Sequence, residues 1–249
     1  MIHIAELGAV DYATALRLQQ ALIELRKQGR VEDVLLLLEH TPVITLGRNA
    51  RRENVLMSDD ELSRRGVGVF ECDRGGDVTF HGPGQLVAYP IFDLRAFTPK
   101  LGAVDFVRRL EEVLIRTCGE FGIETMRVPG RAGVWTRNEA KIAAIGVHIS
   151  RGVTSHGFAL NISTDLDYFG LIVPCGISDK RVTSISIELG RTVPTGEVIP
   201  VVTRHFAGVF GAEINHAESL EELLEQKVGL PMKPPRELRA LFEDEVFWA

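Results

Sequence analysis

Cysteine is scarce in this sequence: only Cys72, Cys118 and Cys175 occur in 249 residues. An odd and widely spaced set provides neither a disulfide framework nor the paired spacing of a zinc site. The seven histidines show no His-Glu-x-x-His or other metal-ligand spacing. These absences exclude the disulfide-rich secreted class, favour a reducing compartment and predict that no metal is bound.

Long apolar runs and an excess of positive charge are also missing. The longest purely apolar run covers residues 34–38, whereas a membrane helix needs about 20 residues. The N-terminus has no basic region followed by an apolar stretch, as a signal peptide would have. With 28 Lys and Arg against 34 Asp and Glu, the net charge is −6, which is not the basic footprint of a nucleic-acid binder. We expect a cytoplasmic protein that binds neither membrane nor nucleic acid.

The order of apolar patterns predicts the fold class. Hydrophobic residues make up 45% of the chain and charged residues 25%, as in ordinary globular proteins. Helical spacing, caps and stop signals predict helices at about 11–28, 103–121, 199–210 and 219–226, with a short one between Ser58 and Gly66. Strands are predicted at 2–7, 34–39, 43–46, 67–72, 78–81, 86–92, 123–128, 133–137, 141–150, 157–162 and 182–188.

Runs of strands with unevenly spaced helices indicate an α+β fold with mixed, largely antiparallel sheets and flanking helices. No repeat or linker divides the chain, so we expect a single catalytic domain over 1–249. Its core should span about 1–210. The rest forms an acidic helical extension at about 211–249, because residues 201–249 carry 5 basic and 9 acidic side chains.

Three features could carry chemistry. Four glycines lie between Arg74 and Gln85, in either a main-chain ligand cradle or a glycine-rich hairpin. Cys118 and Cys72 fall on apolar faces and are expected in the core, whereas Cys175 lies in a Pro-Cys-Gly turn that can present a thiol beside a free N–H. Lys141 begins a strand on an apolar face, where desolvation lowers an amine pKa unless an anion pairs with it.

A thiolate is one such anion, and a nearby ammonium lowers the thiol pKa in return. A strand-end lysine can instead extend its amine into water. A Cys/His pair using His81, His148 or His156 remains an alternative way to activate a nucleophile.

Four blocks taken together resemble the lipoyl(octanoyl) transferase family: 74–90, 141–146, 157–161 and 174–177. The resemblance implies an N-octanoyltransferase with a fold similar to lipoate ligases and the catalytic domain of biotin ligases. It implies that Cys175 carries the acyl group as a thioester, that Lys141 lowers the thiol pKa, and that no metal, nucleotide or other cofactor is bound. The implied substrate site is lined by Arg74, Gly75, Gly76, Asp77, Val78, Thr79, Phe80, His81, Ala144, Ile145, Gly146, Gly157, Phe158 and Ala159.

The resemblance also implies the partners. The donor would be octanoyl-acyl carrier protein, and the acceptors would be lipoyl domains of 2-oxoacid dehydrogenase E2 subunits and the glycine-cleavage H protein, with a monomer expected. Acidic partners would dock on basic clusters at Arg48/Arg51/Arg52, Arg64/Arg65/Arg74 and Lys180/Arg181. The alternatives are an ATP-dependent lipoate or biotin ligase, which needs no cysteine, an amidotransferase between carrier domains, and a non-catalytic module that binds lipoyl domains.

Overall fold

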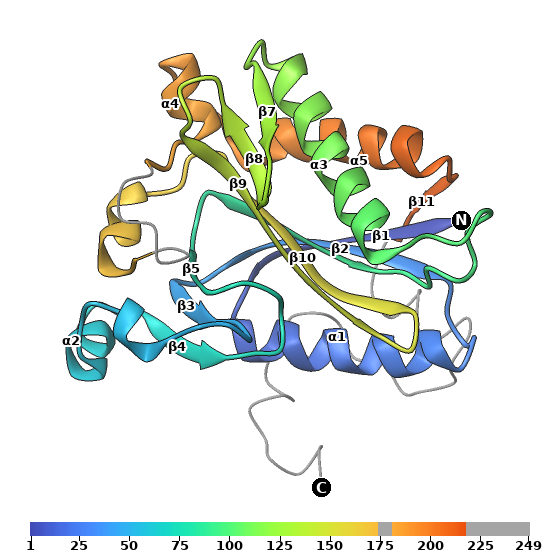
Figure 1. Cartoon of the computed structure of the whole chain (residues 1–249), viewed down its shortest axis with the longest axis horizontal. Helices are drawn as coiled ribbons and strands as arrows, with labels where there is room; N and C mark the ends of the chain where they lie inside the picture. Colours follow the sequence, from blue (N-terminus) through green and yellow to red (C-terminus); the bar gives the residue numbers. More distant parts are fainter. Residues whose placement is uncertain (174–180, 218–249) are drawn as a thin grey trace, which may run out of the picture.

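The computed structural model describes residues 1–173 and 181–217. Its centre is an eight-stranded sheet with the strand order β11-β1-β2-β6-β10-β9-β8-β7 (Figure 1). The strands are β1 (Ile2–Val10), β2 (Asp33–His40), β6 (Gln85–Ile91), β7 (Thr125–Val128), β8 (Arg131–Thr136), β9 (Lys141–Ser150), β10 (Val153–Asn161) and β11 (Ile214–His216). Strands β11, β1 and β2 run parallel, and the other neighbours are antiparallel. The expected α+β class with a largely antiparallel sheet is confirmed.

A second, three-stranded sheet packs at one end of the first (Figure 1). It consists of β4 (Gly68–Glu71), β3 (Val43–Leu46) and β5 (Val78–His81). The short helix α2 (Asp59–Arg64) lies next to it and begins with the capping box predicted from Ser58 and Glu61. The 3-10 turns η1 (Arg52–Asn54) and η2 (Leu166–Leu171) complete this region.

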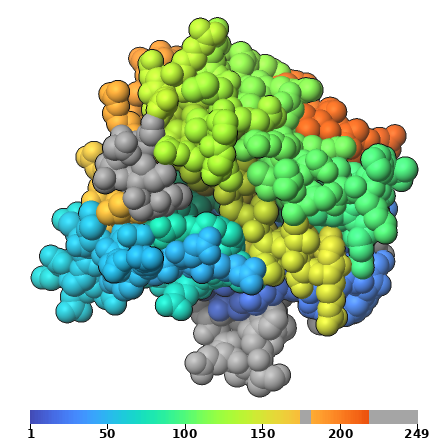
Figure 2. All heavy atoms as spheres, viewed as in Figure 1, coloured from blue at the N-terminus to red at the C-terminus, as the bar shows by residue number. Residues whose placement is uncertain are grey.

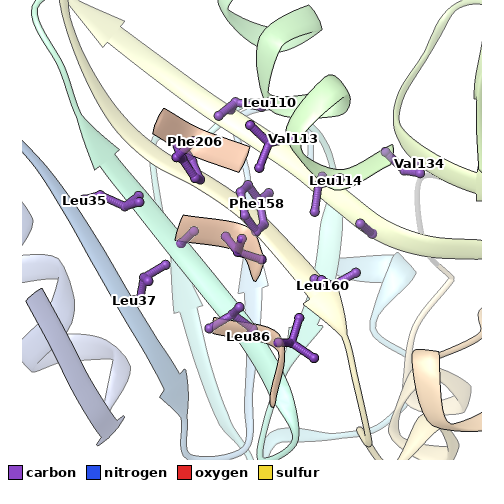
Figure 3. Close-up of a cluster of buried hydrophobic side chains, with 14 of the residues drawn as sticks. Leu35, Leu37, Leu86, Leu110, Val113, Leu114, Val134, Phe158, Leu160 and Phe206 are labelled. Carbon is purple, nitrogen blue, oxygen red and sulfur yellow. The ribbon is translucent and has the colours of Figure 1, made fainter. Parts of the chain in front are cut away.

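Helices cover both faces of the large sheet. Helix α1 (Tyr12–Lys27) lies on one face, and α3 (Ala103–Glu120) and α5 (Thr195–Phe210) lie on the other (Figure 1). Leu35 and Leu37 of β2 pack toward α3 and α5 with Phe206 (Figure 3), while Leu36 and Leu38 pack toward α1. A strand that is buried on both faces has no polar side, which accounts for the apolar run at 34–38.

The expected strand at 182–188 is wrong. Residues Ile185–Leu189 form a short helix, α4, which ends at Gly190 in the left-handed region. The Ser184 side chain accepts a hydrogen bond from Ile187 N, so an N-cap prevails over a pattern of alternating residues. Only Val182 makes a strand-like bridge, in parallel with Lys141.

The sheet also continues past the expected end of the core at about residue 210. Ile2 N donates to Glu213 O at 2.8 Å, and β11 pairs in parallel with β1. The rest of the expected acidic extension, including the helix at 219–226, lies outside the described residues.

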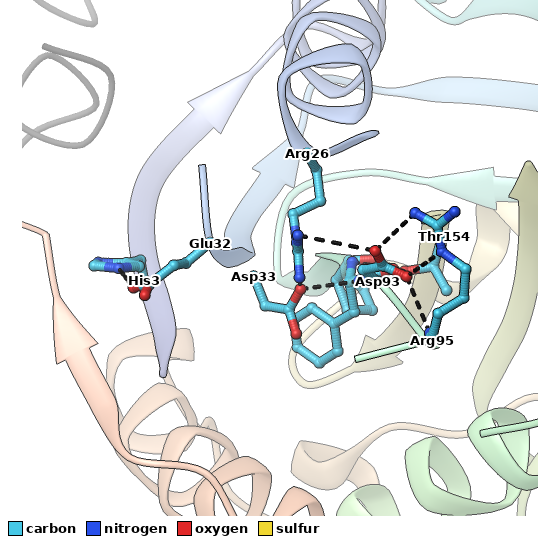
Figure 4. A network of polar contacts seen from close by, with 9 residues as sticks. His3, Arg26, Glu32, Asp33, Asp93, Arg95 and Thr154 are labelled. Carbon is cyan, nitrogen blue, oxygen red and sulfur yellow. Dashed lines mark hydrogen bonds and ion pairs between the residues drawn. The ribbon is translucent and has the colours of Figure 1, made fainter. Parts of the chain in front are cut away.

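A polar network joins α1 to the ends of β2 and β6 (Figure 4). The Arg26 guanidinium lies 2.7 Å from an Asp33 carboxylate oxygen, which also accepts from Asp93 N at 2.9 Å. Asp93 pairs with Arg95 at 2.8 Å.

Among residues 1–173 and 181–217, no helix has the length and apolar character needed to cross a membrane.

Candidate active site

A cavity opens where the loop at 74–77 and β5 of the small sheet meet β6, β9 and β10 of the large sheet. In the space-filling view the β9–β10 hairpin (yellow) lies between α3 (green) and the small-sheet region (cyan) (Figure 2). Lys141 and the predicted substrate-site residues line this cavity, with the exception of Phe80. Three of the four sequence blocks, 74–90, 141–146 and 157–161, therefore meet at one place, and the fourth, 174–177, lies outside the described residues.

Phe80 does not line the cavity among the described residues. It is 1% exposed and packs in the core of the small sheet. Its ring stacks on Tyr168 with 4.7 Å between centroids and contacts Phe169 edge-on at 5.7 Å. Since successive side chains of a strand point to opposite faces, Phe80 faces away while its neighbour His81 reaches the cavity.

Backbone packing explains two of the glycines. Gly75 N donates to Val147 O at 3.0 Å, and a Cβ on Gly146 would lie 2.7 Å from Gly75 O. A Cβ on Gly157 would lie 2.1 Å from Ala88 O. These positions need glycine because two segments of the main chain approach each other closely there. The cavity wall at these positions is therefore formed by main-chain segments in direct contact.

Arg74 is a buried residue of the cavity wall. Its Nε donates to Thr45 Oγ1 at 3.0 Å, and its terminal nitrogens donate to Thr45 O at 2.6 Å and Gly75 O at 3.0 Å. The side chain is 8% exposed. The expectation that Arg74 belongs to an exposed docking cluster is therefore wrong, because its hydrogen bonds tie the 74–77 loop to β3.

The other basic positions are at the surface. Arg48 is exposed, with its guanidinium 3.5 Å from His148 Nδ1. Arg51 and Arg52 each form an ion pair with a nearby acidic residue. Lys180 lies outside the described residues. Arg48 is thus the exposed cation of these clusters that adjoins the loop at 74–76, because Arg48 N donates to Arg74 O.

His81 reaches the cavity in a defined protonation state. Gln85 Nε2 donates to Phe80 O at 3.2 Å and to Asn161 Oδ1 at 2.9 Å, so Gln85 Oε1 faces His81 Nδ1 at 2.8 Å as an acceptor. His81 therefore carries its proton on Nδ1 and leaves Nε2 with a lone pair. Burial, with His40 and Arg74 nearby, holds the pKa of His81 well below its usual value.

The hydrogen bonds of Gln85 and Asn161 continue to the residues that follow position 180. Asn161 Nδ2 donates to Thr183 O at 3.0 Å. Thus His81, Gln85 and Asn161 connect β5, β6 and β10 to residues 181–183, which run beside Lys141. Gln85 is the first residue of β6 and Asn161 the last of β10, and a polar residue that flanks a buried strand is the sequence signal that points to them.

A second buried cluster lies under the cavity around His40. His40 Nδ1 donates to Val10 O at 2.8 Å, so its Nε2 accepts from the Tyr89 hydroxyl at 2.7 Å. Burial lowers the pKa of His40 to about 4. The Tyr12 ring contacts the rings of both His40 and His81. Several further residues line the cavity without having been predicted from the sequence, namely Tyr12, Val87, Tyr89, Phe169 and Val182.

Asp73 pairs with two histidines beside the cavity. Its carboxylate lies 2.7 Å from His156 Nε2 and 3.5 Å from His148 Nε2. The hydrogen bond from His156 lowers the pKa of Asp73 to about 2. Two of the three histidines that the sequence offered as thiol partners, His148 and His156, therefore have a carboxylate neighbour, and His156 also lines the cavity.

Cys118 is a core residue, as predicted: it is fully buried on α3, and burial raises the pKa of its thiol to about 12. The same expectation for Cys72 is wrong, because this residue is only half-buried, and its Sγ donates to Leu46 O at 3.5 Å. Cys175 lies outside the described residues. The described chain ends at Val173, whose N–H donates to Asn54 O, and resumes at Arg181.

Lys141 is the first residue of β9 and lies on the cavity wall with Ala143 and Ile145. Its main-chain N–H donates to Arg181 O at 2.8 Å, and its carbonyl accepts from Thr183 N at 2.9 Å. The lysine is therefore anchored to the segment that directly follows residue 180.

Comparison with known proteins agrees with this arrangement. Residues 11–207 match the lipoyl protein ligase A/B catalytic domain family. The octanoyltransferase of Koribacter versatilis (strain Ellin345) is 61% identical over 248 residues, which cover 99% of each chain. A crystal structure of lipoate-protein ligase A bound with ATP superposes with a TM-score of 0.69 at 16% identity, over 98% of this chain and 94% of that chain.

A biotin protein ligase from Aquifex aeolicus, in complex with biotin and ATP, gives a TM-score of 0.50 at 13% identity, over 96% of this chain and 76% of that chain. At such identities the two ligases show the shared fold alone, and it is the fold that the sequence resemblance implied. The close sequence match decides between the branches of this fold: the chain belongs to the octanoyltransferase family.

Proposed function

We propose that this protein transfers an octanoyl group from octanoyl-acyl carrier protein to a lysine of lipoyl domains, through a thioester on Cys175. The observation that carries this proposal is the position of Lys141 on a cavity wall, where its main chain is hydrogen-bonded to Arg181 and Thr183, shortly after Cys175 in the chain. Phe169 and Val182, on either side of that segment, both line the same cavity. The octanoyltransferase of Koribacter versatilis, at 61% identity, supports the transfer of octanoyl groups.

In the first step the Cys175 thiolate attacks the carbonyl carbon of the donor thioester. A new carbon–sulfur bond forms, the carrier's thiolate leaves, and this thiolate takes up a proton. An ordinary cysteine of pKa about 8.5 is only roughly 3% thiolate at pH 7, so the Lys141 ammonium promotes this step by favouring the anion. The exchange of one thioester for another is close to balanced in free energy.

In the second step the acceptor lysine amine attacks the Cys175 thioester. The amide bond forms and the Cys175 thiolate leaves. The attacking amine gives a proton to Lys141, which is by then a neutral amine because it released its own proton once acylation had removed its anionic partner. An N–H of the Pro-Cys-Gly turn stabilises the oxyanion. An amide is more stable than a thioester, so this step drives the overall transfer.

The apolar part of the cavity suits the acyl chain. Val87, Ala143, Ile145 and Phe158 line it, and burial of the octanoyl tail at about 0.8 kcal/mol per CH₂ contributes roughly 5 kcal/mol of binding. The chain also displaces water, which would otherwise hydrolyse the thioester. Acidic carrier domains would approach along the exposed Arg48, so the apparent KM for the donor should rise with salt.

The test is incubation with octanoyl carrier protein in the absence of ATP, followed by intact mass spectrometry. One added octanoyl group should appear on the parent protein and on the control Cys72→Ala, and none on Cys175→Ala. Retention of the parent transfer rate by Cys175→Ala would exclude the thioester route. Lys141→Ala should form the adduct slowly, because the thiol loses its ammonium neighbour.

The same assay separates the alternatives. An ATP-dependent ligase would form no adduct and would transfer free octanoate only when ATP is supplied, a possibility raised by the shared fold with lipoate-protein ligase A. An amidotransferase would use octanoylated H protein in preference to the carrier protein. A binding module would retain the acceptor domain and show no adduct with either donor.

A further inference from the structure

The pairing of β8 with β9 is irregular at Lys141. Val134 pairs with Ala143, but Trp135 pairs with Lys141, so β9 has one more residue than β8 over this step. A regular antiparallel ladder would have placed Thr136 opposite Lys141. The bulge brings an indole ring to that position instead, and bulges beside functional sites commonly redirect a side chain in this way.

The Lys141 side chain follows the surface of β8 toward that ring. A Cβ on Gly133 would lie 2.9 Å from Lys141 Cε, so the absence of a side chain there leaves room for the lysine stem. The Lys141 Nζ ends 5.2 Å from the centroid of the Trp135 ring. Gly133 and Trp135 are two residues apart in β8 and therefore lie on the same face of the strand. That face contacts both the aliphatic part of the Lys141 side chain and its ammonium group.

The ring is placed for a strong contact. Trp135 is only 4% exposed, and a cation–π contact gains strength where water is excluded, with Trp as the best acceptor. The Arg131 guanidinium lies 5.9 Å from the same ring centroid, so the ring faces two cations. The main chain of Lys141 is fixed separately, by hydrogen bonds with Arg181 and Thr183.

We propose that Trp135 is a positioning residue for Lys141, which holds the ammonium over its ring at the cavity wall and so keeps the charge where it favours a thiolate. This role rests on the proposed function of Lys141 as the partner of Cys175. Trp135 does not line the cavity in the described part of the chain, so it acts through the lysine and not on the substrate.

A pair of substitutions tests the role. Trp135→Phe keeps an aromatic face, whereas Trp135→Leu keeps apolar volume and removes it; neither breaks a hydrogen bond among the described residues, where the indole N–H has no acceptor. We expect Trp135→Leu to slow single-turnover octanoylation of Cys175 about tenfold, with the donor KM unchanged. Trp135→Phe should stay within about threefold of the parent. Equal rates for both variants and the parent would overturn the proposal.

A spectroscopic comparison needs no turnover and covers the case in which Trp135→Leu fails to fold. In a Trp248→Phe background, Trp135 is the sole tryptophan. Lys141→Met should change its fluorescence emission, because the charge beside the ring is lost, and Lys141→Arg should preserve the parent emission. An emission that is the same in all three proteins would overturn the contact.

The two readouts also separate this proposal from the proposed function. If Cys175→Ala still transfers at the parent rate, the thioester route fails, but the fluorescence comparison still decides whether Trp135 holds Lys141. If the adduct forms on Cys175 but the Trp135 emission is the same whichever residue occupies position 141, the transferase mechanism is supported and the positioning role is contradicted.

Discussion

The amide of Gln85 determines which nitrogen of His81 carries the proton. Gln85 Nε2 has two acceptors, so its Oε1 must accept from His81 Nδ1–H. The consequence is a neutral imidazole that presents a hydrogen-bond acceptor to the cavity, and the low pKa of His81 keeps it neutral.

Substitution of Gln85 tests this network. Gln85→Leu leaves His81 Nδ1–H, Phe80 O and Asn161 Oδ1 without their partner. Because each buried group left unpaired costs about 1–3 kcal/mol, we expect the free energy of unfolding to fall by about 2–4 kcal/mol. Urea denaturation measures the change. The control is Gln20→Leu on the exposed side of α1, which should remain within about 0.5 kcal/mol; equal losses would contradict the network.

The close approach of the 74–77 loop to β9 predicts opposite effects for two glycine substitutions. Gly146→Ala places a Cβ 2.7 Å from Gly75 O, so it should destabilise the fold by about 1–3 kcal/mol. Gly119→Ala, inside α3 with nothing within 4 Å of its Cβ, should stabilise it by about 0.5–1 kcal/mol. Thermal unfolding followed by circular dichroism measures both, and a neutral Gly146→Ala would argue against backbone contact at this wall.

The buried His40 predicts a loss of stability in acid. Its folded-state pKa of about 4 lies below the ordinary value of 6.5, so between these values the unfolded chain binds a proton that the folded chain does not. Stability should therefore fall as the pH decreases from 6.5 toward 4, by about 3 kcal/mol from this residue.

Urea unfolding at pH 7, 6 and 5 measures the effect. His40→Gln is the matched variant, because its amide can donate to Val10 O and accept from Tyr89. The variant should lose less stability over this range than the parent. Part of the pH dependence should remain in the variant, because the pKa of His81 is also lowered in the folded protein. Identical pH dependence in both proteins would contradict a neutral His40.

The thiols should differ sharply in reactivity. Cys118 is fully buried with a pKa raised to about 12, so iodoacetamide at pH 8 should leave it unmodified in the folded protein and alkylate it in urea. Peptide mass spectrometry locates the label. Cys175, if its thiol is activated as proposed, should be alkylated within the folded protein at pH 7. Fast labelling of Cys118 before unfolding would show that α3 opens.

The sequence predicted local features well where one signal dominated. The strands at 43–46, 78–81 and 141–150 have the bounds that the alternation predicted. The failure at 182–188 came from a competing signal, the Ser184 cap. Phe80 was included in the substrate site because a contiguous motif was carried over whole, although a strand sends alternate residues to opposite faces.

What the sequence could not predict depends on contacts between distant segments. Tyr12 reaches the cavity from α1, and no local pattern relates it to His81. The glycines between Arg74 and Gln85 suggested either a cradle for a ligand or a hairpin, and Gly75 lies against the backbone of Val147 in β9. Whether the approaching backbone at such a glycine belongs to a ligand or to the protein depends on how distant strands are paired. The one-residue bulge that brings Trp135 opposite Lys141 likewise has no signature in either strand alone.

The parallel pairing of β11 with β1 bears on how this protein is shortened for experiments. A chain ended at residue 210, where α5 stops, would remove the β11 partner of β1 and leave a row of unpaired main-chain groups beside Ile2 and Ile4. Such an edge recruits strands from other molecules. Truncated preparations would therefore aggregate, whereas those that retain residues up to His216 keep the edge covered.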